Sequence, residues 1–326
     1  MPPFSRGRKK HVGWGEVRTP AFGTLEHAGV RVAYPNLYIT HSWSQVRFLL
    51  YTFNMSTEEP DTTIASRGHS TNLVGLPTGL LASASYNDFP VPLCISGTRE
   101  SHRSLFERLS NLTDAVEAGR VFQDYMAVVF GLEHEPEKNE RRRYRASYLR
   151  LLKDWGFDSN SPAGAVLKGW VESRVGLFPT FHKAPIRRFN SPAWIHYMEE
   201  KMSSRFNNNA INMQFDLLYE FCQWMLVRFH ATGKKHLQLY RGTNDLREQQ
   251  LIRQLDARNA IVRLNNLVSF TSQRGIADEF GDTIIEAEVP VSKILFFNDL
   301  LLGHPLRGEA ECLVIGGDYR VKMSYW

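Results

Sequence analysis

Between residues 100 and 232, apolar residues recur at the three- and four-residue spacing of α-helices. This spacing predicts one helix over 142–155 and a second over 162–175. Ser161 followed by Pro162 is a typical helix start, because serine caps the first turn and proline suits its first position. A further helix is indicated by leucines that share one face: Leu105, Leu109 and Leu112.

The segment 214–229 repeats apolar residues with the same period and predicts a helix that stops before Gly233. Several of its side chains are aromatic: Phe215, Tyr219, Phe221, Trp224 and Phe229. Such a row admits two interpretations, an aromatic cofactor site or the packing of a protein core. The helical spacing favours core packing.

Beyond residue 233 the pattern changes to the alternation that is typical of strands. Strands are predicted over 237–241, 283–291 and 309–314. Gly316, Gly317 and Asp318 stand between two apolar runs, which predicts a β-hairpin with its turn at these residues. Helices followed by strands, without βαβ alternation, indicate an α+β protein.

The pattern divides the chain into three parts. We expect a mainly helical lobe over 55–232 and a β-rich catalytic core over 233–326. Residues 1–54 show no sustained period, and their seven Lys/Arg and two Glu account for the formal net charge of +5 of the whole chain. We expect the protein to start at Met55, with residues 1–54 a mis-annotated upstream extension or a disordered basic arm.

Composition narrows the class of protein. The 326 residues are 43% hydrophobic and 22% charged, which is typical of a soluble globular protein. The three cysteines fit neither a disulfide framework nor a zinc site, and no apolar run approaches the length of a membrane span. We therefore expect a cytoplasmic protein without a metal. Since the residues after 54 are neutral overall, the charge does not indicate a nucleic-acid partner.

Familiar catalytic motifs are absent from the sequence. No G-x-G-x-x-G follows a predicted strand, and no P-loop, H-E-x-x-H or G-x-S-x-G motif occurs. Rossmann-type dinucleotide binding, P-loop phosphate binding, zinc proteolysis and α/β-hydrolase chemistry are unsupported.

Three short elements of the second half carry candidate chemistry. Arg241 and Gly242 end a predicted strand, and a serine-containing run, 269–272, ends another. Glu309 and Glu311 begin a third and, two residues apart in a strand, point to the same face. Each element alone has a plain interpretation: an edge charge, a turn and a solvated strand face. The pair Glu286 and Glu288 is a second Glu-x-Glu for which we favour that plain interpretation.

Together the three elements resemble the arginine–serine–glutamate signature of mono-ADP-ribosyltransferases of the cholera-toxin-like class. Longer segments are similar to the dinitrogenase reductase ADP-ribosyltransferase family, and the similarity covers about 66–326. The segments are Gly68-His-Ser-Thr-Asn-Leu-Val-Gly-Leu-Pro77, 96–106, 144–150, Trp155-Gly-Phe-Asp158, Gly169-Trp-Val-Glu-Ser-Arg174 and Leu264-Asn-Asn-Leu-Val-Ser-Phe-Thr-Ser272. By analogy, the fold expected is a split β-sandwich around an NAD⁺ cleft, preceded by the helical lobe.

The resemblance implies roles that agree with the chemistry of the residues. The guanidinium of Arg241 suits the pyrophosphate of the co-substrate NAD⁺, because its fork of donors matches two oxygens. Cleavage of the nicotinamide–ribose bond builds positive charge on the sugar, and Glu311 is the carboxylate expected to stabilise it. Glu309 is expected to orient the acceptor arginine and to accept its proton.

The serine element is expected to fix the nicotinamide ribose and the catalytic glutamate. The class commonly reads aromatic-x-Ser-Thr-Ser, which makes Ser272 the first choice and Ser269 the second. Gln273 and Arg274 depart from that pattern. Thr271 and Gly242 complete the expected cofactor-binding set.

The resemblance further implies an activity and its partners. The expected reaction is ADP-ribosylation of an arginine on dinitrogenase reductase, which inactivates nitrogen fixation in a bacterium, under control by a PII-type signalling protein. The loop 302–308 is expected either to recognise the target protein or to be a simple connector. Three alternatives stay open: an NAD⁺ glycohydrolase, an arginine transferase with another protein target, and a non-catalytic binding module.

Overall fold

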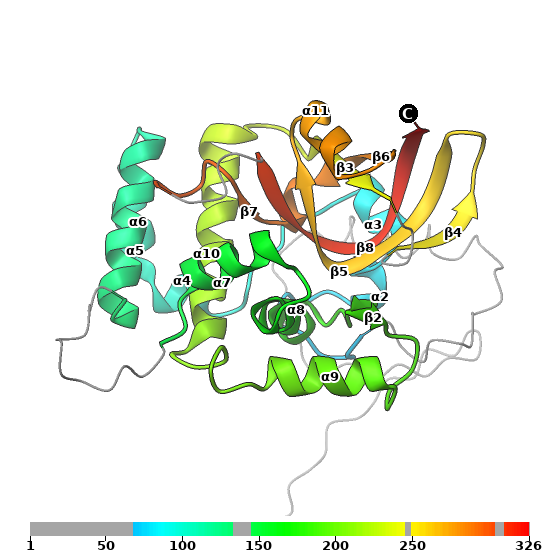
Figure 1. Cartoon of the computed structure of the whole chain (residues 1–326). Coiled ribbons are helices and arrows are strands. Elements are labelled where there is room, and N and C mark those ends of the chain that lie inside the picture. Colours follow the sequence, from blue (N-terminus) through cyan, green and yellow to red (C-terminus); the bar gives the residue numbers. More distant parts are fainter. Residues whose placement is uncertain (1–67, 133–144, 245–248, 304–309, 326) are drawn as a thin grey trace, which may run out of the picture. The chain divides into compact units, whose positions relative to one another are not determined.

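The computed structural model describes residues 68–132, 145–244, 249–303 and 310–325, drawn in colour in Figure 1. Most helices of the described residues lie before residue 233: α2 (Thr78–Leu81), α3 (Ala84–Asp88), α4 (Thr98–Ser101), α5 (Arg103–Ser110), α6 (Ala115–Phe130), α7 (Tyr148–Phe157), α8 (Pro162–Val175), α9 (Pro192–Lys201) and α10 (Ile211–Met225). The expected arm 1–54 lies outside the described residues, and the division into lobes stays a prediction.

Local sequence signals set the helix ends. α8 has its predicted bounds, since Ser161 Oγ accepts a hydrogen bond from the amide of Gly164 at 3.1 Å and Gly176 ends the helix at φ +89°. α7 begins at Tyr148, with Ser147 as its cap, whereas the spacing predicted a start at residue 142, which lies outside the described residues. The serine hydroxyl provides the start that the apolar spacing alone does not locate.

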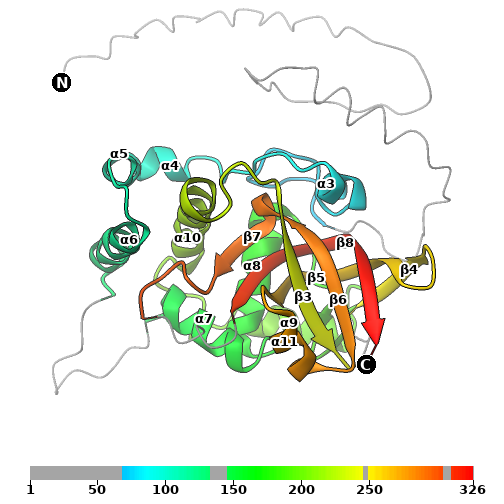
Figure 2. The same cartoon turned by 90° about the horizontal axis from the view of Figure 1, so that it is seen from above.

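α10 and the turn after it confirm the predicted helix and the core interpretation of its aromatic residues. A π-helical turn, Leu226–His230, continues α10 to the region of the predicted end. Phe215, Tyr219 and Phe221 are buried, and the ring of Phe221 stacks on Phe122 of α6 at 4.0 Å between centroids. α5 and α6 lie on the side of α10 that faces away from the sheet (Figure 2).

The second part of the chain forms a six-stranded antiparallel sheet in the order β4-β5-β3-β6-β8-β7. Its strands are β3 (His236–Thr243), β4 (Gln250–Gln254), β5 (Asn259–Thr271), β6 (Thr283–Pro290), β7 (Ile294–Phe297) and β8 (Glu311–Tyr325), and β1 (Phe181–His182) and β2 (Ala184–Pro185) form a separate small pair. β5 also pairs with β8, so the pairings β3–β5–β8–β6–β3 close a ring. The α+β class is confirmed, whereas the split-sandwich layout stays a prediction.

The predicted hairpin at Gly316 and Gly317 is wrong, because β8 runs through both glycines as one strand. Opposite them, the register with β5 shifts between Leu264 and Leu267. A Cβ on Gly316 would lie 1.6 Å from the carbonyl oxygen of Asn265, and Gly317 has φ +119°. These glycines therefore permit a close backbone approach at an irregularity in the sheet, not a turn.

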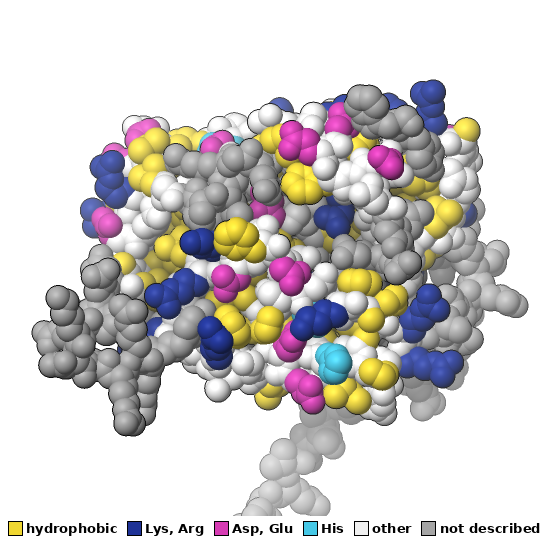
Figure 3. Space-filling view, viewed as in Figure 1, with side chains coloured by type: hydrophobic (Ala, Val, Ile, Leu, Met, Phe, Trp, Pro, Cys, Tyr) yellow, Lys and Arg dark blue, Asp and Glu magenta, His cyan; other side chains and the backbone are white. Residues whose placement is uncertain are grey.

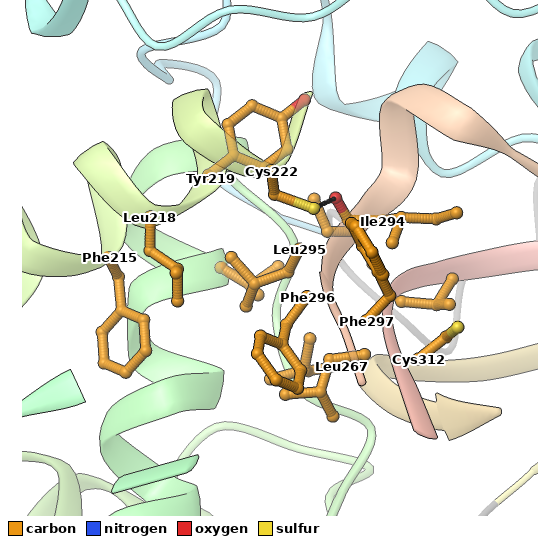
Figure 4. Packing of buried hydrophobic residues seen from close by; sticks show 14 of the residues in the cluster. Phe215, Leu218, Tyr219, Cys222, Leu267, Ile294, Leu295, Phe296, Phe297 and Cys312 are labelled. Atoms are coloured by element: carbon orange, nitrogen blue, oxygen red, sulfur yellow. Dashed lines mark hydrogen bonds between the residues drawn. The ribbon is translucent and has the colours of Figure 1, made fainter. Parts of the chain in front are cut away.

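One hydrophobic core joins the helices to the sheet. Phe215, Leu218 and Cys222 of α10 face Leu295 and Phe296 of β7 (Figure 4). Polar groups reinforce the same contact, since the side-chain amide of Gln223 donates to the carbonyls of Val291 and Ile294 at 3.0 and 2.8 Å. The position of α10 against the sheet is thus fixed by both packing and hydrogen bonds.

Candidate active site

A cavity of about 610 Å³ lies between the α7–α8 connection and the ends of three strands. Residues 155–159 and Phe181 line it on the helical side, and 240–244, 269–271 and Glu311 line it on the sheet side. Ala277 and Phe280 complete the lining. The face of the molecule on which α7, α9 and α11 lie carries interspersed side chains of both charges (Figure 3).

Arg241 reaches this cavity from the end of β3. Tyr240 pairs with Thr271, which places the last residues of β3 beside the end of β5. The half-buried Arg241 donates from Nη1 to the carbonyl oxygen of Ser269 at 2.9 Å. This contact ties the guanidinium to the serine segment that the sequence predicted as its neighbour in the site.

Ser269 and Glu311 are in direct contact. β5 and β8 pair Ser269 with Leu313 and Thr271 with Glu311, so Ser269 and Glu311 are diagonal neighbours on one face. Ser269 Oγ donates to Glu311 Oε1 at 2.5 Å, and Glu311 is only 5% exposed. The sheet register therefore brings Arg241, Ser269 and Glu311 to one cavity wall.

The other predicted site residues are placed differently. Thr271 is buried on the cavity wall, whereas Ser272 is exposed, is absent from the lining, and donates its backbone N–H to the carbonyl of Ala310 at 3.3 Å. Glu309 and most of the loop 302–308 lie outside the described residues.

Gly242 lines the cavity for a reason of packing. After β5 the chain forms the short helix α11 (Arg274–Ala277) and a 3₁₀ turn (Asp278–Phe280). A Cβ on Gly242 would lie 1.9 Å from the carbonyl oxygen of Ala277. Only glycine lets the end of β3 approach α11 this closely, which keeps Arg241 and Phe280 on neighbouring walls.

Comparisons with known proteins assign the chain to a family. A sequence model of the dinitrogenase reductase ADP-ribosyltransferase (DRAT) family matches residues 71–323. The chain is also 61% identical over 264 residues, which is 79% of this chain and 96% of the relative, to the NAD(+)--dinitrogen-reductase ADP-D-ribosyltransferase of Rhodospirillum rubrum. The chain belongs to the dinitrogenase reductase ADP-ribosyltransferase family. No solved structure matches it.

These comparisons confirm the family that the sequence resembles and the prediction that the protein is a transferase. In the described residues, no group of three or more His, Cys, Asp or Glu is arranged to hold a metal ion. No helix in the described ranges combines the length and the apolarity that crossing a membrane requires.

Sequence reasoning missed several aromatic residues of this cavity. Trp155 is 3% exposed and donates from Nε1 to Ser269 Oγ at 2.8 Å. Phe157 and Phe280 also line the cavity, and they are 80% and 52% exposed. The signal for the first two was the segment Trp155-Gly-Phe-Asp158, which we read only as a mark of resemblance.

The thiol of Cys312, next to Glu311, is buried. Burial, together with the nearby charges of Glu311 and Asp299, raises the pKa of Cys312 to about 12. A thiol with such a pKa stays protonated near neutral pH and is a poor nucleophile. The carboxylate of Glu311 is therefore the candidate reactive group on this part of the wall.

Proposed function

We propose that this chain transfers ADP-ribose from NAD⁺ to an arginine of dinitrogenase reductase. The observation that carries the proposal is the convergence of Arg241, Ser269 and Glu311 on one cavity in a chain of the dinitrogenase reductase ADP-ribosyltransferase family. The relative from Rhodospirillum rubrum bears the name of this reaction.

The cavity suits a dinucleotide in size and chemistry. Its volume of about 610 Å³ lies within the range of small-molecule sites. Arg241 supplies the cationic fork that a pyrophosphate requires. The exposed rings of Phe157 and Phe280 offer apolar surface on which the bases of NAD⁺ can pack.

Glu311 is the proposed catalytic carboxylate. When the bond between nicotinamide and ribose breaks, the electron pair leaves with neutral nicotinamide and positive charge develops on the sugar. A fixed carboxylate in a largely buried position stabilises that charge electrostatically. Glu311 has this position, since it is 5% exposed and its Oε1 accepts from Ser269.

We assign the key serine to Ser269 instead of Ser272. Ser269 lines the cavity and contacts Glu311, whereas Ser272 is exposed and is not part of the lining. If the first serine of the class motif is aligned with Ser269, the motif ends before Gln273 and Arg274. The departure from the class pattern at these two residues is then consistent with the assignment. Thr271 and Gly242 are retained as wall residues.

Glu309 is proposed as the group that prepares the acceptor. A guanidinium has a pKa above 12, so it must lose a proton to attack the sugar. Glu309 is expected to accept that proton as the new bond forms between the acceptor nitrogen and the ribose carbon. The arginine acceptor, control by a PII-type protein and a cytoplasmic location are parts of the proposal that rest on the family resemblance.

The test is incubation of the protein with labelled NAD⁺ and purified dinitrogenase reductase, followed by peptide mapping. We expect label on one arginine of the reductase and none with Glu311→Gln. Free ADP-ribose without labelled reductase would contradict the proposal and favour an NAD⁺ glycohydrolase. Label on other proteins but not on the reductase would favour a different target.

A further inference from the structure

In the described residues, a side chain of helix α7 contacts the serine of the proposed site directly. Trp155 lies in the third turn of α7, 114 residues before Ser269, and its indole Nε1–H donates to Ser269 Oγ at 2.8 Å. The indole is 3% exposed. This contact belongs neither to the arginine–serine–glutamate signature nor to the sheet that carries it.

The chemistry of the two groups fixes the direction of the next hydrogen bond. An indole N–H can only donate, and a serine hydroxyl has one proton and two acceptor positions. Because Trp155 occupies one acceptor position of Ser269 Oγ, the hydroxyl proton points away from the indole. It is directed to Glu311 Oε1, 2.5 Å away. The order of donation is therefore Trp155 to Ser269 to Glu311.

The indole itself is held by α8. The ammonium of Lys168 lies over the ring of Trp155, 5.9 Å from its centroid. Lys168 is 1% exposed and donates to Asn160 Oδ1 at 2.9 Å and to the carbonyl oxygen of Phe181 at 3.1 Å. A buried cation fixed by two acceptors restricts the ring beneath it, and with it the N–H that reaches Ser269.

We propose that Trp155 is a positioning residue for the transfer reaction: through Ser269 it holds the carboxylate of Glu311 in the orientation that stabilises the charged sugar. This inference rests on the proposed function. It assigns to the helical part of the chain a role in the chemical step in addition to forming a wall of the cavity.

The first test compares Trp155→Phe with wild type. The phenylalanine ring keeps most of the packing but lacks the N–H, so Ser269 is no longer oriented. We expect kcat for transfer, and for NAD⁺ cleavage without acceptor, to fall about tenfold, which corresponds to one hydrogen bond. KM for NAD⁺ should stay within about twofold, because Glu311 acts on the charge of the transition state.

Trp170→Phe is the matched control. Trp170 is also buried and also donates its indole N–H, to Asp216 Oδ1 at 2.8 Å, but it does not line the cavity. We expect this variant to lower the melting temperature and to keep kcat. If Trp155→Phe and Trp170→Phe have the same kcat, the loss of an indole hydrogen bond has no specific effect and the inference is overturned.

A double-mutant cycle tests the route through Ser269. If Trp155 acts through this serine, Trp155→Phe should slow the Ser269→Ala enzyme no further. Additive losses would overturn the inference. Trp155→His, whose ring N–H can still donate, should retain more activity than Trp155→Phe, and this variant serves if the phenylalanine variant does not fold.

The outcomes separate this inference from the proposed function. An active wild type whose Trp155→Phe variant keeps its full kcat would contradict only the role of Trp155. A wild-type protein that neither labels dinitrogenase reductase nor cleaves NAD⁺ would contradict the proposed function itself.

Discussion

Two polar clusters of this protein combine charged side chains with aromatic rings, and they differ in whether they line the cavity of the candidate active site. The cleft cluster comprises Trp155, Arg241, Ser269 and Glu311 and lines the space of about 610 Å³. The closed cluster comprises Tyr86, Arg263, Lys293, Asp318 and Tyr319, all of them buried and none of them part of that lining. Similar residue types therefore have different roles in the two clusters: ligand binding where they line the cavity, and stability where they do not.

The closed cluster ties the irregular middle of β8 to its surroundings. Lys293 Nζ donates to the carbonyl oxygen of Gly316 at 3.0 Å and lies 5.3 and 5.1 Å from the ring centroids of Tyr86 and Tyr319. Arg263 of β5 pairs with Asp318 at 2.7 Å. These contacts connect β5 and β8 next to the register shift, so the cluster acts on stability and strand alignment.

The largest effect is expected from Asp318→Asn in the closed cluster. Arg263 and Lys293 would lose the buried charge that faces them, and breaking a buried pair costs about 3–5 kcal/mol. Urea denaturation should show this fall in the free energy of unfolding, with KM for NAD⁺ unchanged in the folded fraction. A loss below about 1 kcal/mol would show that the pair does not stabilise the sheet.

Glu311→Gln tests the cleft cluster, where we expect an effect on activity and little effect on stability. We expect kcat to fall about 10²–10³-fold, because one placed electrostatic group is lost. The free energy of unfolding should change by less than about 1 kcal/mol. Stopped assays of nicotinamide release, with denaturation on the same sample, give both values. Full activity, or unfolding in place of inactivity, would refute the distinction between the clusters.

Lys293→Met tests the closed cluster through the pH dependence of the free energy of unfolding. Burial lowers the pKa of Lys293 from 10.5 to about 7, and Asp318 opposes the shift. Between these values the unfolded state binds the extra proton, so the free energy of unfolding rises with pH by roughly 1 kcal/mol per unit.

The useful window for this measurement is about pH 7–8.5. Above it the buried thiols of Cys222 and Cys312, whose pKa is raised, contribute with the opposite sign. Denaturation curves across the window should lose the positive slope in Lys293→Met and keep it in wild type. Equal slopes in the two proteins would show that Lys293 is protonated in the native state.

The smallest effect is expected from Glu288→Gln, the control for Glu311→Gln. Glu288 belongs to the other Glu-x-Glu, on β6, and its side chain is exposed. The other glutamate of that pair, Glu286, has its Oε2 3.7 Å from Nζ of Lys322. A surface carboxylate contributes within about 0.5 kcal/mol, so neither activity nor stability should change measurably. A loss of activity here would mean that the Glu-x-Glu pattern was assigned to the wrong strand.

The helices could be predicted largely from the sequence because their signals are local. Ser161 and Pro162 start α8, and a left-handed glycine, Gly176, ends it. The catalytic candidates Arg241 and Glu311 were also recognisable, because they stand in short sequence motifs that resemble a known signature. Their convergence could only be assumed, since it depends on the pairing of β5 with both β3 and β8.

What the sequence did not reveal depends on contacts between distant segments. Gly316 and Gly317 were predicted to form a turn, because a pair of glycines at a register shift has the same local sequence pattern as a pair of glycines in a hairpin. Trp155 meets Ser269 across 114 residues, and no local spacing encodes that contact. The choice between Ser269 and Ser272 likewise depends on which of them the sheet register turns toward Glu311.

A crystal structure of Glu311→Gln with NAD⁺ tests most directly the claim that the cleft cluster binds the dinucleotide. We predict a pyrophosphate oxygen within about 2.7–2.9 Å of the guanidinium of Arg241, the nicotinamide ribose beside Ser269, and the closed cluster unchanged. NAD⁺ bound elsewhere, or bound here with its pyrophosphate turned away from Arg241, would contradict the account.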